Sequence, residues 1–427
     1  MHDVIIIGGG FAGCSAAREV RRAGLNAMIL EARDRIGGRT WTADWDGREI
    51  ERGGGWVHWF QPHVWTEIMR HGLTPVPGFE AERVYWPCGD QRRSGSHDDY
   101  EKIANRAWNK FVEGAEQMLP LPHLPLTHPD RIARIDGLTI RERISELDLT
   151  DEEEGVLIAE TESVASGPID QAGAFSVIRW HALSGFSLTL TQETGGFITI
   201  AEGTRGILTP ILREASAEIH FDTPVAAIEQ QRDSVVVTTR AGEAIPARAV
   251  VVTTPLNALS GIDFAAGLSE LKQEGIAYGQ ASRGIKIFIR VRGPQVRCNA
   301  VHPDHPFGHV STQLLHDDGT QTLIGFGSDY AKCRPDDLGW VQEQLDRTLP
   351  GYQVLASSAT DWLSDEFSRG TWAIHRPGWY LRFHAEMQRP EGRVVLAGAD
   401  IANGWAGFID GAIESGTRGG RLASSMV

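Results

Sequence analysis

The sequence predicts an α/β fold, because short apolar strands are followed by glycine-rich turns and helices at several places. Residues 4–7 read Val-Ile-Ile-Ile, which is typical of a parallel strand buried on both faces. A second strand, residues 27–30, follows the first helical stretch, and segments beginning near residues 202 and 392 have a similar pattern. These observations predict one domain assembled from three separate stretches of chain.

The turn after the first strand carries a glycine fingerprint. Gly8 permits a tight turn, Gly10 lets a pyrophosphate approach the backbone, and Gly13 lets the helix pack closely on the strand. The second strand ends at Glu31, where a carboxylate can accept the hydroxyl hydrogens of an adenosine ribose. In this order the elements predict a Rossmann-like dinucleotide site, whereas the fingerprint alone also allows a purely structural turn.

Between these stretches lie two segments of different composition. They contain a Pro-rich turn region at residues 120–129, amphipathic helical patterns near 100–116 and 152–163, a strand at 284–291 and a helix at 339–349. At 427 residues, the chain is long for one core, so an interleaved α+β second domain is expected. The first domain is predicted to comprise residues 1–75, 196–283 and 386–427, and the second residues 76–195 and 284–385.

Charge and composition exclude several classes of partner. The net charge of −15 disfavours binding to nucleic acid or to an anionic membrane, and it suits either a cationic substrate or an ordinary acidic protein. There is no run of eighteen uncharged apolar residues, and the first strand follows Met1 too closely for a signal segment. The four cysteines show no CxxC spacing, which is typical of a reducing compartment. We therefore expect a cytoplasmic protein.

Further motifs follow the fingerprint in a fixed order. They are Arg35-Ile36-Gly37-Gly38-Arg39, the Glu-Arg-Gly-Gly-Gly-Trp-Val-His run at 51–58, Lys286 within its strand, Ala-Gly-Ala-Asp at 397–400 and Gly-Phe-Ile-Asp-Gly-Ala at 407–412. Through them the whole chain resembles the flavin-containing monoamine oxidase family, and within it the bacterial 6-hydroxynicotine oxidases. The resemblance implies a Rossmann-like FAD-binding domain with an interleaved α+β substrate domain (a GR2-type fold) and FAD as the cofactor.

The resemblance also implies which residues hold the cofactor. Arginine pairs bind phosphate oxygens in a fork, and glycines let backbone lie against a flat ring. Residues 401–406 contain no cysteine where some relatives attach their flavin, so noncovalent FAD is expected. The residues expected at FAD are Gly8, Gly10, Phe11, Ala12, Gly13, Glu31, Ala32, Arg33, Arg35, Gly38, Arg39, Gly54, Gly55, Trp56, Val225, Thr254, Gly398, Asp400, Gly407, Phe408 and Ile409.

Lys286 is the first residue expected to take part in the chemistry. It alternates with Ile285 and Ile287 and so faces away from them; from the pattern alone, a solvated lysine is the alternative. In the family, a lysine in this strand holds a water beside the flavin. Trp372 and Phe408 match the family's two aromatic walls, although many relatives carry Tyr in place of Phe408. His58 and Trp56 are expected to line the substrate pocket.

The resulting prediction is an FAD-dependent amine oxidase acting on a small-molecule amine, of N-heterocyclic, nicotine-type or aryl-alkyl structure, as in alkaloid degradation. Hydride passes to flavin, the imine hydrolyses, and O2 is reduced to hydrogen peroxide. The resemblance to the family also implies a homodimer, which no feature of this sequence predicts independently. The alternatives are a flavin amine dehydrogenase, an L-amino-acid oxidase using Arg179 or Arg376 for the substrate carboxylate, and a non-catalytic flavin-binding redox sensor.

A metal site is not expected. His58, His63, His302, His305 and His309 lack the helical pairing with a third ligand that zinc sites show, and Pro303 and Pro306 forbid a helix in the last group.

Overall fold

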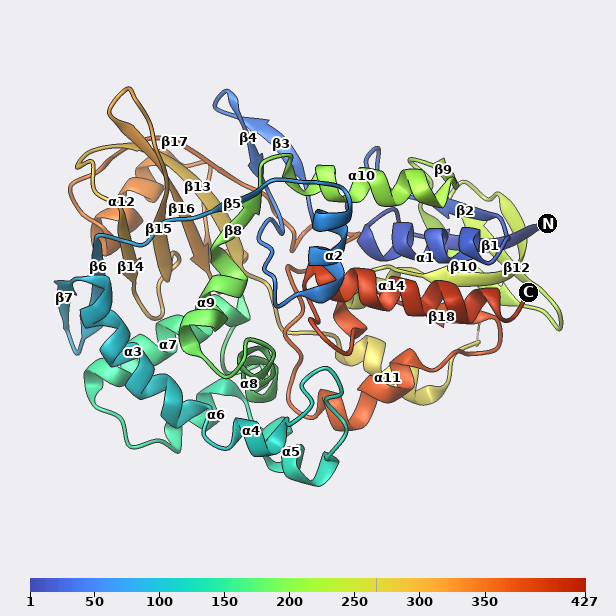
Figure 1. Cartoon of the computed structure of the whole chain (residues 1–427), viewed down its shortest axis with the longest axis horizontal. Coiled ribbons are helices and arrows are strands. Elements are labelled where there is room, and N and C mark those ends of the chain that lie inside the picture. Colours follow the sequence, from blue (N-terminus) through green and yellow to red (C-terminus); the bar gives the residue numbers. More distant parts are fainter. Residues whose placement is uncertain (266) are drawn as a thin grey trace.

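The computed structural model describes residues 1–265 and 267–427. One β-sheet lies in each half of an elongated molecule, and the two chain termini lie close together at one end (Figure 1). Each sheet draws its strands only from the stretches predicted for one of the two domains. The α/β character is therefore confirmed, while the domain boundaries stay a prediction.

The first sheet has the order β10-β11-β12-β1-β2-β9, with β18 beside β12. Its pairs are parallel around β1, whereas β10, β11 and β12 form an antiparallel meander. Val4, Ile5 and Ile6 of β1 are fully buried, as expected for a strand covered on both faces. The strands are β1 (His2–Ile7), β2 (Ala27–Leu30), β9 (Glu218–His220), β10 (Val225–Gln230), β11 (Val235–Thr239), β12 (Ala244–Val252) and β18 (Val394–Leu396).

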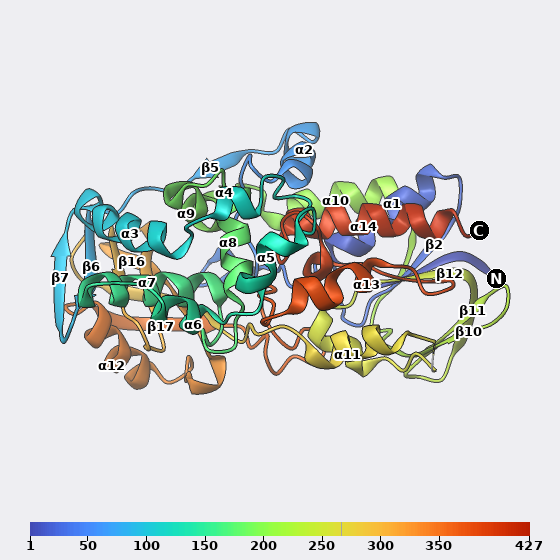
Figure 2. The ribbon, with the colours of Figure 1, turned by 90° about the horizontal axis from the view of Figure 1, so that it is seen from below.

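Helices cover both faces of this sheet (Figures 1 and 2). One layer contains α1 (Phe11–Arg22), α10 (Gly203–Ala215) and α14 (Ile409–Ser424), with α2 (Pro62–Arg70) at its end; the other contains α11 (Glu270–Tyr278) and α13 (Ala385–Gln388). A Cβ on Gly416 of α14 would lie 2.1 Å from the carbonyl oxygen of Ala12. The two helices therefore touch backbone to backbone, which seats α14 directly against the glycine turn.

The second sheet has the order β17-β13-β16-β15-β14-β6-β7 and is antiparallel except between β14 and β6. Ile285, Ile287 and Ile289 of β13 pack in a core with α12 (Leu338–Thr348), so Lys286 and Phe288 face the opposite side, as predicted. The strands are β6 (Arg83–Cys88), β7 (Gln91–Gly95), β13 (Ile285–Arg292), β14 (Cys298–Val301), β15 (His309–Leu315), β16 (Thr320–Gly327) and β17 (Gln353–Ala359).

A layer of helices lies beneath the second sheet (Figure 1). Its first helix ends at Phe111, earlier than the predicted residue 116, because Gly114 adopts a left-handed conformation (φ 82°). No helix within the described ranges is long and apolar enough to cross a membrane. The remaining elements are α3 (His97–Phe111), α4 (Ala115–Met118), α5 (Pro129–Asp136), α6 (Ile140–Ser145), α7 (Asp151–Ala165), α8 (Ala174–Leu183), α9 (Leu188–Gly196) and the ribbons β3 (Thr42–Trp45) with β4 (Arg48–Glu51) and β5 (Pro75–Pro77) with β8 (Ile198–Ile200).

Candidate active site

A cavity of about 920 Å³ runs between the two sheets. One end is formed where β1, β2 and β12 finish, at Gly8, Glu31 and Thr254. Ligands of open α/β sheets bind at these carboxyl ends, where the helix N-termini also meet. The other end lies against the second sheet and the helical layer, and Lys286 and Trp372 are part of its wall. The volume is large enough for a dinucleotide cofactor at one end and a small molecule at the other.

The glycine turn forms a cradle for phosphate. Gly8 has φ 105°, a conformation that favours glycine, and a Cβ on Gly13 would lie only 1.9 Å from the carbonyl oxygen of Gly8. The helix can therefore start immediately beside the strand. Gly10 is the N-cap of α1 and offers no side chain to the amides of the first turn, which also lacks acidic residues. These amides are available to an anion, so the turn fits a pyrophosphate.

Glu31 is fixed at the end of β2. One carboxylate oxygen accepts a hydrogen bond from the amide of Gly9 (2.6 Å), and the other accepts from the amide of Arg33 (2.9 Å). Each oxygen keeps a lone pair for a further donor, and the residue borders the cavity. This geometry fits the two hydroxyls of an adenosine ribose.

The arginine-diglycine segment divides its two arginines between different tasks. Arg39 borders the cavity, donates to the carbonyl oxygen of Thr371 (2.6 Å) and forms an ion pair with Asp400. Arg35 donates to the carbonyl oxygens of Gly38 (3.0 Å) and two neighbours, and it stacks on an indole ring, so it holds the loop closed.

Four residues predicted to contact ligands do not line the cavity. Arg35 is turned onto loop carbonyls, and Asp400 accepts from Arg39 and from the amide of Leu256 (2.8 Å). Gly13 lies behind the turn, in its packing role. The predicted contacts of Arg35 and Asp400 with FAD are therefore corrected to positioning roles, since each side chain is committed to protein partners. The fourth residue is His58. Every other residue expected at FAD borders the cavity.

His58 is fully buried in the wall behind the cavity. Its Nδ1 accepts from the amide of Phe60 (3.3 Å), and its Nε2 lies 3.4 Å from a carboxylate oxygen of Glu193. Burial lowers the pKa of His58 despite this carboxylate. The expectation that His58 lines the substrate pocket is corrected, because this tight turn points the ring inward and leaves Glu193 on the cavity surface.

Lys286 contacts the loop at residues 51–56, which borders the cavity. Its Nζ donates to the carbonyl oxygens of Glu51 (2.7 Å) and Gly53 (2.8 Å) and lies 4.4 Å from the ring centre of Trp56. Burial lowers the pKa of Lys286 to about 7, against the weaker attraction of the Glu51 carboxylate. Because an ammonium has three hydrogens, one donor remains beyond the two carbonyls.

Aromatic rings that border the cavity hold one another in place. The indole of Trp372 donates to the carbonyl oxygen of Val164 (2.9 Å), and its ring packs edge-on against Phe326 (6.3 Å between centres). Phe408, the N-cap of α14, packs edge-on against Trp180 (4.7 Å). All of these rings border the cavity. The sequence analysis missed Phe326 and Trp180, since aromatic residues in an ordinary strand and helix carry no spacing signal.

The two arginines proposed to bind a substrate carboxylate are occupied elsewhere. Arg179 is buried and donates to the Tyr380 hydroxyl (2.6 Å) and to backbone carbonyls of the 403–404 turn. Arg376 donates to the side-chain oxygen of Gln171 (3.1 Å). Neither borders the cavity, so neither is placed to recognise an amino acid there.

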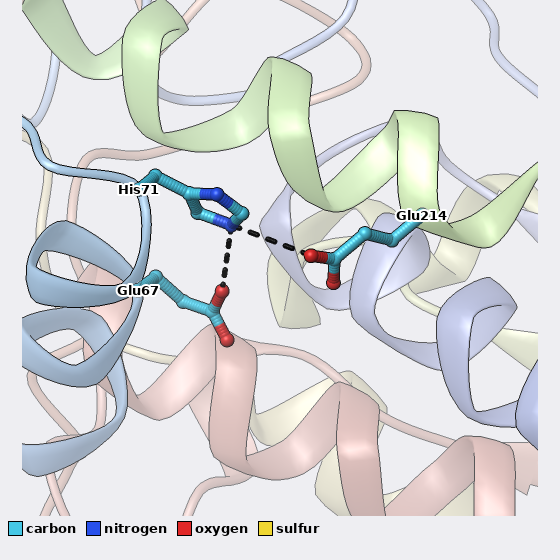
Figure 3. Close-up of side chains that lie close together, drawn as sticks. All are labelled: Glu67, His71 and Glu214. Carbon is cyan, nitrogen blue, oxygen red and sulfur yellow. Dashed lines mark ion pairs between the residues drawn. The ribbon is translucent and has the colours of Figure 1, made fainter.

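Glu67, His71 and Glu214 converge between α2 and α10 (Figure 3). The His71 Nε2 lies 3.4 Å from Glu67 and 3.6 Å from Glu214. Arg70 lies 2.8 Å from oxygens of both carboxylates, and Arg18 lies 2.8 Å from Glu67. Because two guanidinium groups already balance the two carboxylates, this cluster is an ion-pair network rather than a cation site.

Residues 11–421 match the family described as flavin containing amine oxidoreductase. The chain belongs to this family. It is 36% identical over its whole length to pseudooxynicotine dehydrogenase of a Pseudomonas species, of which 87% is covered. It is 35% identical, again over its whole length, to nicotine dehydrogenase of Pseudomonas putida, of which 89% is covered. It is 27% identical over 97% of both chains to (S)-6-hydroxynicotine oxidase of Paenarthrobacter nicotinovorans.

The fold is likewise shared with solved structures. Putrescine oxidase bound to putrescine superposes with a TM-score of 0.85 at 22% identity, over 99% of this chain and 98% of the other. The predicted family, α/β fold and FAD cofactor are thus confirmed, and the chain is an oxidoreductase that oxidises amines with flavin. The glycine turn and Glu31 suit the adenosine diphosphate part of FAD, and residues 54–56 suit its ring.

Proposed function

We propose that the substrate is an amine carried on an N-heterocyclic or aryl-alkyl framework, of the nicotine type. The observation that carries this proposal is an aromatic wall, formed by Trp372, Phe408 and Trp180, in the cavity that the buried Lys286 also borders. Flat rings stack well on aromatic side chains, and such rings also attract the ammonium form of an approaching amine. The curated relatives named for nicotine and pseudooxynicotine support the same class.

Within this proposal, the chain orients the amine and keeps water away from it. Bound FAD supplies the acceptor for a hydride from the carbon next to the amine nitrogen. Trp372 and Phe408 hold the amine so that this carbon faces the loop at residues 54–56, and the surrounding rings exclude bulk water. The ammonium must first lose a proton so that the nitrogen lone pair is free; loss of the hydride then leaves a positively charged iminium, and water hydrolyses it to a carbonyl compound and an amine.

Lys286 is proposed to position a water molecule. Two of its hydrogens are committed to the carbonyl oxygens of Glu51 and Gly53, and the third is free for a water at the boundary of the two cavity ends. A lysine whose pKa lies near 7 can exchange a proton with that water at neutral pH. The expected role is thus to hold and move a proton next to the reacting groups.

The final electron acceptor is proposed to be O2, which takes two electrons and two protons to give hydrogen peroxide. A protein carrier is the competing acceptor, because two of the relatives are named dehydrogenases. Noncovalent FAD, a homodimer and a cytoplasmic location are also proposals; the absence of cysteine at 401–406 and four free thiols elsewhere support the first and last of these.

The deciding experiment is anaerobic mixing of the FAD-loaded protein with primary, secondary and N-heterocyclic amines, with amino acids as controls. Loss of the oxidised-flavin absorbance with an N-heterocyclic or aryl-alkyl amine, and not with amino acids, supports the proposal. Reoxidation rates with O2 and with a protein carrier then identify the acceptor. Reduction by amino acids alone, or by no amine, would contradict it.

A further inference from the structure

Helix α7 presents one ionisable residue, Glu160, to the cavity. Its N-terminus is fixed by a capping box between Thr150 and Glu153, and its residues Glu160, Ser163 and Val164 all border the cavity. These positions are spaced i, i+3 and i+4, so they lie on one face of the helix. Glu160 lies about one helical turn, roughly 6 Å along the axis, from Val164, whose carbonyl oxygen accepts the indole hydrogen bond of Trp372.

The two oxygens of the Glu160 carboxylate have different surroundings. Oε1 accepts from the Tyr100 hydroxyl and from the Gln192 side-chain amide (3.2 Å). Among residues 1–265 and 267–427, no hydrogen bond reaches Oε2, and no Lys, Arg or His forms an ion pair with Glu160. The Glu160 side chain is half-buried and borders the cavity, so its unpaired oxygen is accessible to a ligand there.

A carboxylate in this setting lacks a partner for its charge. Burial raises the pKa of Glu160, and the hydroxyl and amide donors only partly oppose that effect. A purely structural role, holding Tyr100 and Gln192, would need only the oxygen that both already share. The second oxygen is therefore available for a donor that enters the cavity, and a basic nitrogen would balance the charge.

We propose that Glu160 determines specificity by accepting a hydrogen bond from a second basic nitrogen of the substrate. This inference rests on the proposed function and narrows its substrate class to amines with a second basic nitrogen at the end of the molecule remote from the one that is oxidised. A terminal ammonium and a pyridinium share the required N–H donor. Trp372 and Phe408 hold the reacting amine, while Glu160 sets the far end of the molecule.

Two matched pairs of substrates test the proposal on the FAD-loaded protein. N-methyl-4-(3-pyridyl)butylamine is compared with N-methyl-4-phenylbutylamine, and N-methylpentane-1,5-diamine with N-methylhexylamine. Hydrogen bonds to charged groups contribute enough for roughly a tenfold or greater preference in kcat/KM for at least one nitrogen-bearing member. Glu160→Gln should reduce that preference to about threefold or less, while oxidation of the phenyl and hexyl compounds stays within about threefold of wild type.

Glu154→Gln is the matched control, because Glu154 lies on the exposed face of the same helix. It should keep the wild-type preference, and FAD content shows that each variant is folded. Three results would overturn this inference and leave the proposed function standing. They are equal oxidation of both members of each pair by wild type, an unchanged preference in Glu160→Gln, and failure of Glu160→Gln to oxidise the phenyl and hexyl compounds as well. If no amine reduces the wild-type flavin, the proposed function fails and the inference fails with it. If the preference occurs in just one pair, that pair shows which nitrogen Glu160 recognises: a pyridinium for the pyridyl pair or an ammonium for the diamine pair.

Discussion

The two ends of the cavity use different atoms for recognition. At the end beside β1 and β2, the groups aimed at the ligand are mainly backbone amides of the Gly8 to Gly13 turn, and Glu31 is held by the amides of Gly9 and Arg33. At the end beside α7, the groups are side chains such as Trp372, Phe408 and Glu160, each braced by another residue. A backbone cradle fixes a constant cofactor, whereas a side-chain wall can change with the substrate.

The largest expected effect tests the backbone cradle. Gly13→Ala places a Cβ about where the Gly8 carbonyl oxygen stands, at 1.9 Å, so α1 and β1 must separate. We expect loss of FAD and a markedly lower melting temperature, measured by flavin absorbance after gel filtration and by thermal unfolding. Gly261→Ala is the control, because a Cβ there meets no atom within 4 Å. Full FAD content in Gly13→Ala would mean that the cradle tolerates movement.

The next effect tests whether the lysine belongs to the chemistry or to the scaffold. Lys286→Met keeps the length of the side chain and removes the donors to Glu51 and Gly53. We expect FAD to remain bound and the anaerobic rate of flavin reduction by amine to fall by roughly 100-fold or more, because proton handling is lost. An unchanged rate would show that Lys286 serves the scaffold and takes no part in the chemistry.

A smaller effect is expected at Phe408, where two substitutions distinguish the contribution of the aromatic ring from that of a hydroxyl group. Phe408→Ala removes the contact with Trp180 and one wall of the cavity, so kcat/KM should fall by about tenfold. Phe408→Tyr keeps the ring and restores the hydroxyl seen in many relatives, and it should stay within about threefold of wild type. Equal losses in both variants would show that polarity, and not ring stacking, governs this wall.

The last effect is a pH dependence of stability. Burial lowers the pKa of Lys286 from 10.5 to about 7 in the folded chain, so between these values the unfolded chain binds more protons. Relative to Lys286→Met, wild type should become more stable as pH rises from about 7 toward 10.5, by up to about 1 kcal/mol per pH unit. Urea unfolding of both proteins with equal excess FAD measures this difference; parallel curves would mean that Lys286 titrates near its usual pKa.

The contrast between the two ends also explains which predictions succeeded. Apolar runs and alternation within a few residues predicted the strands that end just before Gly8 and Glu31, and they also predicted that Lys286 lies on the face opposite its isoleucine neighbours. The structure has both features. His58 was misplaced because the turn that points its ring inward depends on contacts with Phe60 and Glu193. Arg35 and Asp400 were matched to family positions. Arg35 instead donates to carbonyls of its own loop, and Asp400 meets Arg39 only when distant segments come together.

By itself, the sequence determined the fold class, the cofactor and the family, because short motifs indicate each of them and the backbone geometry of such motifs depends on local residues. The tertiary structure alone decided which side chains border the substrate. Glu160, Trp180 and Phe326 come from α7, α8 and β16, and they border one cavity only after the second sheet and the helical layer enclose it. Packing between distant segments leaves no periodic pattern in the chain, so such a wall is visible only in three dimensions.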